Sequence, residues 1–249
     1  MTGWCDFRSD PRMKTRQLPF VVCLLLILPG TPLPAAEPWA EALAQMPLAT
    51  TNGVVLREQN CVRLLLQSFR RDERVKALVF MPGATDEFYM FHRAQALVTN
   101  ASPTLMDAVA ALTNHTYIRA TFLAPLLILH TDEDPITPLI QVVDEPTAAK
   151  VRAAKLSRQG VYFDMDYDHI RRVLRSTFHL TMTPDSRSPD SWHFFRHSFA
   201  AYNLNGWEAL QAITLAGKET LRIERKKLVF EGDLRVRQRP QFPTGAPAQ

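Results

Sequence analysis

The chain has 249 residues, of which 46% are hydrophobic and 22% charged, a composition typical of one or two globular domains. This balance excludes a largely disordered chain and a chain that fills a membrane. The formal net charge of +4 falls to about +2 without the first 36 residues, so we expect no nucleic-acid partner.

The first 36 residues have the layout of a secretory signal peptide. Lys14 and Arg16 form a positively charged start, residues 18–28 form an apolar run, and two alanines ending at Ala36 form a small-residue cleavage site. The run is too short to span a membrane, and a proline lies near each of its ends. We therefore predict cleavage after Ala36; a retained anchor is the alternative.

Cleavage would decide where the mature chain resides and how it is stabilised. We expect a secreted or periplasmic protein with no transmembrane segment, and we interpret residues 1–12 as a mis-called start that precedes the signal pattern. Cys61 is then the only cysteine, so no internal disulfide can form and a packed core must supply the stability. We predict that Cys61 is buried at the start of an apolar helix.

The rest of the chain contains an internal similarity, which indicates two copies of one unit. The stretch DEFYMFHR aligns with DSWHFFRH 104 positions later, and MDAV aligns with WEAL 101 positions later. Upstream, NCVRLLLQSF aligns with DHIRRVLRSTF at a separation of 108 positions. We therefore predict an α+β fold of two duplicated small modules, residues 53–132 and 160–235, each built from strand-helix-strand units. The alternative is a chance alignment of two amphipathic α/β stretches.

Helices are expected before and between the modules. A short helix is predicted at residues 38–45. Residues 133–159 are predicted to form a helical linker, because acidic residues and Pro146 precede strong helix formers and Gly160 follows them. The tail, residues 236–249, is rich in proline, lacks apolar periodicity and is expected to be disordered.

The second module has the clearest pattern of elements. Residues 161–167 alternate between apolar and polar side chains, which predicts a half-buried strand, and helical spacing follows at residues 169–178. A short strand then stops at Pro184. An extended segment from His197, a helix over residues 206–217 that ends at its glycine, and a closing hairpin complete the module.

The stretch VYFDMDYDHIRRVLRSTFHLTMTPD resembles the secretin and TonB short N-terminal domain, a small βαβ module at the periplasmic end of bacterial secretins and TonB-dependent receptors. The likeness rests on the Phe163-Asp164 pair in an alternating strand and on the aliphatic pair Val173-Leu174 in the next helix. The layout of residues 197–232 is similar to that of the same family. The resemblance implies a protein-interaction or scaffolding role in the cell envelope and supplies no catalytic residue.

Two histidines four positions apart, His193 and His197, raise the question of a metal site. On one helix they would be neighbours and share an ion, with Asp190 or His179 as a further ligand. On a strand they would stand about 13 Å apart, too far for one ion. The first copy aligns Tyr89 and Arg93 with the two histidines, so we expect packing positions and no metal or other cofactor.

Three carboxylates, Asp164, Asp166 and Asp168, alternate in the stretch FDMDYDH. Side chains on one face of a strand would together bind a hard cation. The simpler interpretation is a solvent-facing edge, with Asp168 capping the following helix. The inner face of this strand would then carry Val161, Phe163, Met165 and Tyr167.

We predict that the mature chain is a non-catalytic module that binds an envelope protein or assembly. Four aromatic side chains are candidates for a groove between the modules: Phe88, Tyr89, Trp192 and Phe195. The alternative function is that of a secreted metal-dependent hydrolase that uses His193, His197 and Asp190.

Overall fold

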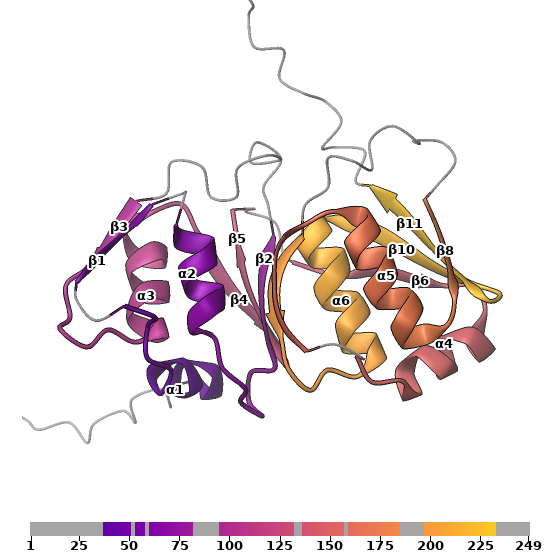
Figure 1. Cartoon of the computed structure of the whole chain (residues 1–249), viewed down its shortest axis with the longest axis horizontal. Coiled ribbons are helices and arrows are strands. Elements are labelled where there is room, and N and C mark those ends of the chain that lie inside the picture. Colours follow the sequence, from indigo (N-terminus) through magenta and orange to yellow (C-terminus); the bar gives the residue numbers. More distant parts are fainter. Residues whose placement is uncertain are drawn as a thin grey trace, which may run out of the picture. The chain divides into compact units, whose positions relative to one another are not determined.

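The structure is a computed structural model that describes residues 37–50, 53–57, 60–81, 95–131, 136–156, 159–184 and 197–232. This part of the chain contains both helices and strands, so the predicted α+β class is confirmed (Figure 1). We call the described residues between 37 and 131 the first half, and those between 136 and 232 the second half. No helix among them is both long and apolar enough to cross a membrane.

The first half contains three helices and five strands. In chain order they are α1 (Pro38–Ala44), β1 (Val54–Arg57), α2 (Cys61–Ser68), β2 (Ala77–Met81), β3 (Gln95–Val98), α3 (Leu105–His115), β4 (Arg119–Leu123) and β5 (Leu126–His130). The predicted short helix near residue 38 is α1, and Cys61 begins α2 as expected.

The second half contains three helices and six strands. They are β6 (Leu139–Val142), α4 (Glu145–Ala153), β7 (Gly160–Met165), α5 (Tyr167–Phe178), β8 (Thr181–Pro184), β9 (His197–Ala201), α6 (Gly206–Gly217), β10 (Glu219–Glu224) and β11 (Lys227–Gly232). The predicted strand before Pro184, the extended segment from His197 and the closing hairpin are all confirmed.

The strands form three sheets, and one of them joins the two halves. The sheets have the strand orders β1-β3, β4-β5-β2-β9-β7 and β6-β10-β11-β8. The five-stranded sheet is shared, because β2 of the first half pairs antiparallel with β9 of the second. Helix α2 packs on β7 and β9, and α6 packs on β2 and β9, so helices from both halves contact this sheet.

Apart from β6, which has no counterpart among the described strands of the first half, both halves repeat the same sequence of elements and the same strand pairings. In the first half β1 pairs antiparallel with β3, β4 pairs antiparallel with β5, and β2 pairs parallel with β5. In the second half β7, β8, β9, β10 and β11 make the corresponding pairs. The register is repeated too. In the first half Ala77 lies opposite Leu126, and in the second half Thr181 lies opposite Lys227. Thr181 follows Ala77 by 104 positions, and Lys227 follows Leu126 by 101. These are the separations at which the two sequences align.

Helix α4 is shorter than predicted and holds the same place in its half as α1. It ends at Ala153 rather than continuing towards Gly160. After α1, the backbone N–H of Leu105 donates to the carbonyl of Met46 over 2.8 Å. After α4, the N–H of Gly206 donates to the carbonyl of Ala154 over 2.7 Å. The segment predicted as a linker therefore contains a helix with a structural counterpart in the first half.

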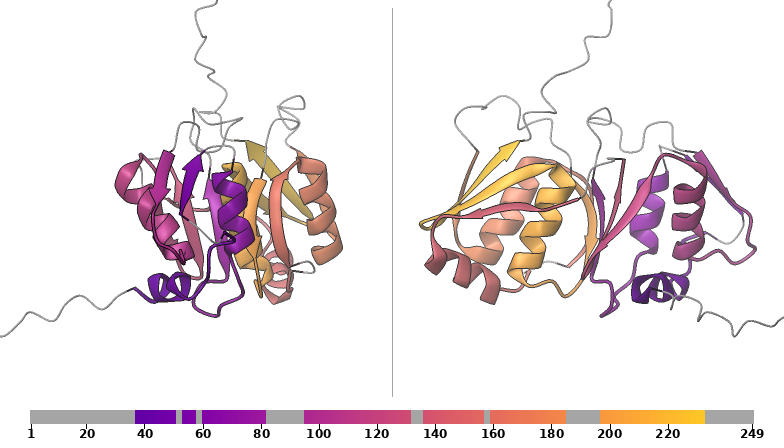
Figure 2. Two further views of the ribbon diagram at one scale, coloured as in Figure 1. Left: turned by 60° about the vertical axis from the view of Figure 1, so that its left-hand side comes forward. Right: turned by 180° about the vertical axis from the view of Figure 1, so that it is seen from behind.

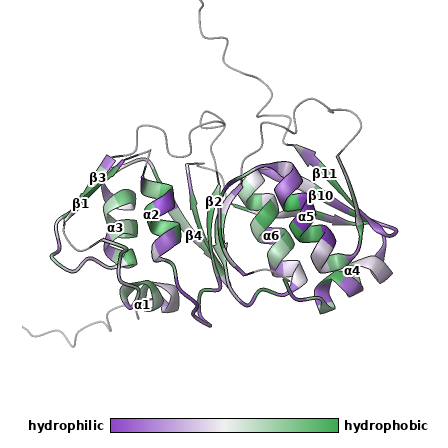
Figure 3. Ribbon diagram, viewed as in Figure 1, coloured by the Kyte–Doolittle hydropathy of each residue, from purple (hydrophilic) through white to green (hydrophobic). Residues whose placement is uncertain are grey.

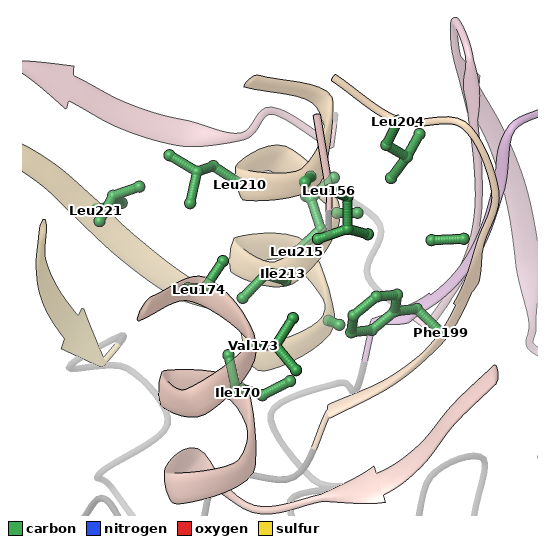
Figure 4. Close-up of a cluster of buried hydrophobic side chains, with 14 of the residues drawn as sticks. Leu156, Ile170, Val173, Leu174, Phe199, Leu204, Leu210, Ile213, Leu215 and Leu221 are labelled. Carbon is green, nitrogen blue, oxygen red and sulfur yellow. The ribbon is translucent and has the colours of Figure 1, made fainter. Parts of the chain in front are cut away.

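The buried apolar residues form two cores, each built mainly on the helices of one half and completed by strand residues of the other half. The core of the first half is built on α2 and α3, through Leu65, Leu66 and Leu112, and that of the second half on α5 and α6. In the second half, Ile170, Val173 and Leu174 of α5 cluster with Ile213 of α6 and Phe199 of β9 (Figure 4). Hydrophobic and hydrophilic residues recur along α2 and α5 (Figure 3), and the buried residues Ile170, Val173 and Leu174 share one face of α5. Helical spacing of apolar residues, as predicted for α5, is what produces such a face.

The alternation predicted for strand β7 is wrong at its start, and a bulge interrupts it further along the strand. Tyr162 is the buried residue, 5% exposed, whereas Val161 is 38% exposed. The ring of Tyr162 stacks on Phe199 with centroids 4.5 Å apart. Asp164 has a φ of 52°, and the pairing with β9 shifts register there. A bulge changes which side chains face the core, so strict alternation fails beyond it.

The predicted start of α5 is also corrected, whereas the predicted end of α6 at Gly217 is confirmed and only its cap differs. Helix α5 begins at Tyr167, which the sequence pattern had placed in the strand, and Asp166 rather than Asp168 is its N-cap. The side chain of Asp166 accepts a hydrogen bond of 2.8 Å from the N–H of His169. At the end of α6, Gly217 is the last helical residue, and Lys218 adopts the left-handed conformation expected of the glycine.

Candidate functional site

Most side chains proposed for a site from the sequence lie outside the described residues. This applies to the four aromatic groove candidates Phe88, Tyr89, Trp192 and Phe195, and to His193 and Asp190. They fall in residues 82–94 and 185–196, which occupy corresponding places in the two halves, between β2 and β3 and between β8 and β9. The arrangement of these two stretches stays a prediction.

His197 is described, and it lies inside the protein. It is the first residue of β9, with a side chain that is fully buried. Its Nε2 lies 3.3 Å from Oε2 of Glu219, the first residue of β10, whose side chain is 1% exposed. Because His197 is a strand residue, it does not share a helix with His193, and the helical i, i+4 metal pair does not form.

The glycine that ends α6 makes room for this pair. A Cβ atom added to Gly217 would lie 2.4 Å from Nε2 of His197 and 2.9 Å from the carboxyl group of Glu219. Tyr167 is a further neighbour: burial raises the pKa of its hydroxyl, and the negative charge of Glu219 raises it further. His197, Glu219 and Tyr167 thus form a polar cluster inside the second half. The side chains of His197 and Glu219 both lie out of contact with solvent.

The described nucleophile candidates are occupied or buried. The N–H of Asp164 donates to Oγ of Ser198 over 2.9 Å. Ser198 follows His197 directly on a strand, so the two side chains point to opposite faces of the sheet. Burial raises the pKa of the Cys61 thiol to about 12, so little thiolate forms at neutral pH.

The three carboxylates of FDMDYDH do not share one strand face. Asp164 lies in the bulge of β7, Asp166 caps α5, and Asp168 is exposed in the first turn of that helix, where it pairs with Arg171 over 3.1 Å. Across the described ranges, no group of three or more His, Cys, Asp or Glu side chains is placed to hold a metal ion. The three residues act on local structure instead.

We expect Asp166 to contribute more to the free energy of unfolding than Asp168, because only Asp166 caps α5. Replacing Asp166 by alanine removes the acceptor for the His169 N–H and should lower the free energy of unfolding by about 1 kcal/mol. Asp168→Ala is the matched control: it removes only an exposed ion pair and a favourable helix-dipole contact, worth about 0.5 kcal/mol or less. Urea unfolding of both variants measures the difference. Equal losses would contradict the assignment of Asp166 as the cap.

The sheet edges carry the exposed apolar side chains. Of the large hydrophobic residues in the described part, four are exposed, and each lies on or beside an edge strand: Leu97 in β3 (58%), Val161 in β7 (38%), Val143 directly after β6 (63%) and Tyr117 just before β4 (44%). An edge strand presents unpaired backbone N–H and C=O groups to a partner. We call these four positions the edge residues.

The sequence analysis missed the edge residues because which strand is an edge depends on pairing. Val161 was predicted to face inward because the strand pattern shows alternation and not which strands become its neighbours. The presence or absence of charged residues within a strand would have been a partial signal of which edges are protected from pairing. Strand β1 ends in Arg57 and β4 begins at Arg119, whereas β3 and β8 carry no charged residue.

Comparison of this chain with protein-family models, with characterised proteins and with solved structures finds no match.

Proposed function

We propose that this protein is a non-catalytic interaction module of the cell envelope, secreted or periplasmic, which binds a partner protein by strand addition at its sheet edges. The observation that carries this proposal is the position of the edge residues. Strand addition combines main-chain hydrogen bonds along an open edge with contacts to alternate side chains. Each edge residue supplies apolar contact area beside an open edge.

The order of elements supports the envelope setting. The resemblance to the secretin and TonB short N-terminal domain was to a layout of strand, helix and strand, followed by an extended segment, a helix and two strands. In the second half this is the order β7, α5, β8, β9, α6, β10 and β11. The first half has the same order, and the repeated register supports our proposal that the two halves derive from one duplicated unit.

The experiment is native mass spectrometry of the chain purified from the envelope of its host. We expect a metal-free mass with a stoichiometric protein companion. Lysine at Leu97 and Val161 together should weaken the companion's binding at least about tenfold, because strand addition would bury the new charges. The control is Ala149→Lys, which puts the same charge on an exposed position of α4.

Two results would contradict the proposal. The first is unchanged affinity for the companion in the Leu97→Lys, Val161→Lys variant, since the sheet edges would then not be the contact. The second is one bound zinc ion and no companion, which would favour the hydrolase built on His193 and Asp190. Each variant is first checked for unaltered thermal unfolding, so that loss of binding is not loss of fold.

A further inference from the structure

The junction between the two halves has unpaired counterparts elsewhere in the molecule. Inside the chain, β2 of the first half pairs antiparallel with β9 of the second. The strand that corresponds to β2 is β8, and the strand that corresponds to β9 is β3. Among the described strands, β8 pairs only with β11, and β3 pairs only with β1. Among the described strands, neither therefore has a neighbour on the side that its counterpart uses for the junction. The two strands lie at opposite ends of the described structure (Figure 2).

We propose that β8 of one copy of this chain pairs antiparallel with β3 of a second copy, and so reproduces between molecules the β2–β9 junction within each. This inference names the partner for the edge-binding function proposed above and rests on it. In the internal junction Ala77, Leu78 and Val79 lie opposite Ala201, Ala200 and Phe199. Strand β8 follows β2 at a separation of 104 positions, and β3 is matched to β9 at the last paired residue of each strand, Val98 with Ala201. This match transfers the register to Thr181, Met182 and Thr183 opposite Val98, Leu97 and Ala96.

Burial in the internal junction offers an explanation for the exposure of Leu97, the edge residue of β3. Leu78 and Ala200 lie opposite each other, and both are fully buried in the core of the first half. Their counterparts are Met182, 7% exposed in the core of the second half, and Leu97, 58% exposed. In the proposed pairing Leu97 would lie against the second-half core of the neighbouring copy, as Ala200 lies against the first-half core within the chain.

The other faces of the two strands fit the same arrangement. Thr181, which is exposed, and Thr183, which is half-buried, take the places of Ala77 and Val79 and would approach Ala96 and Val98. Neither β3 nor β8 carries a charged side chain that would oppose pairing.

Pro184 limits the strength of the contact. Proline has no N–H to donate, so the last pair of the internal junction, Phe80 with Ser198, has no full equivalent at Pro184 and Gln95. Three residue pairs remain, which makes the association weak and reversible. Because the contact joins two different surfaces, it continues from copy to copy in an open row or closes into a ring.

The first test is sedimentation velocity of the full chain over a micromolar to millimolar concentration series. We expect a rise in mean sedimentation coefficient with concentration that Leu97→Lys and Thr181→Lys each abolish. Ala149→Lys, which places the same charge on an exposed position of α4, is the matched control and should associate as the parent does. A parent that stays monomeric throughout, or association that survives both edge variants, would overturn the proposal.

The second test determines which residues of β3 and β8 lie opposite each other. In a background with Cys5 and Cys23 replaced by serine, one preparation carries Leu97→Cys and another carries Met182→Cys. Directly opposite residues bring their Cβ atoms within about 5.5 Å, close enough for a disulfide. Oxidation should give a covalent dimer only in the mixture of the two preparations. A dimer from the Leu97→Cys chain alone would show symmetric β3–β3 pairing and would refute the register proposed here.

The experiments distinguish failure of the proposed interaction function from failure of the proposal that the partner is a second copy. A heterologous companion bound at the edges of a chain that does not self-associate supports the interaction module and refutes the second copy as its partner. Self-association through β3 and β8 without any companion supports both, with the module acting as a scaffold of its own copies. If neither a companion nor self-association is found, both proposals are overturned.

Discussion

Replacing Gly206 by alanine is expected to destabilise the protein by more than about 3 kcal/mol. The added Cβ would lie 2.1 Å from the carbonyl oxygen of Val151 and 2.6 Å from Cε1 of Phe178. A carbonyl oxygen in α4 moves only if the helix moves, so the clash would force α4 and α6 apart and expose the core between them. Since a whole domain is stable by about 5–15 kcal/mol, a loss of this size approaches unfolding.

The other tight glycines give a graded comparison. At Gly217 the nearest contact of an added Cβ is a side-chain atom, Nε2 of His197 at 2.4 Å, which has more freedom to shift than a backbone atom. At Gly53 the nearest contact is 3.1 Å away, so a small adjustment suffices. Urea unfolding of the three Gly→Ala variants should rank the losses in the order Gly206, Gly217, Gly53. A Gly206→Ala chain as stable as the Gly53→Ala chain would contradict the close approach of α4 and α6.

The second large effect is expected at the buried pair of His197 and Glu219. Replacing His197 by leucine leaves the carboxyl group of Glu219 buried without its hydrogen-bond partner, which should cost about 3 kcal/mol or more. Glu219→Leu leaves the histidine in the same position and should cost a similar amount. The double variant should be more stable than either single one, because no unpartnered polar group remains there.

The first half supplies a natural precedent for an apolar residue at this position. The hairpin register places Ile118 where Glu219 lies in the second half, and Ile118 is 1% exposed. A double-mutant cycle by chemical unfolding measures the coupling between the two positions. Losses that simply add would show that the 3.3 Å contact contributes nothing to stability.

The sequence predicted the elements whose signals are local. Helices α5 and α6 follow from their apolar spacing, since Val173, Leu174, Leu210 and Ile213 are all buried where the period of 3.6 places them. Strand β7 was misread because nothing local marks Asp164 as the site of a bulge. Its positive φ is tied to the contact between its N–H and Ser198, 34 positions away.

The features that define the candidate site are not local, and the sequence did not reveal them. The pairing of β2 with β9 joins segments more than 100 positions apart, and no residue in either strand identifies the other. Glu219 opens an alternating stretch and reads as a surface residue, yet the pairing of β10 and the end of α6 bury it. Edge strands and buried polar pairs both depend on which strands become neighbours.

The shared five-stranded sheet also bears on how the chain folds while it is being made. The core of the first half includes Ala200, which belongs to strand β9. The first 131 residues therefore leave the ribosome before a strand that completes their own core has been synthesised. A gap on the β2 side of that core stays open until residue 201 has emerged. The core of the first half therefore cannot be completed until the second half has been translated. We expect the two halves to reach their final packing in one late folding step.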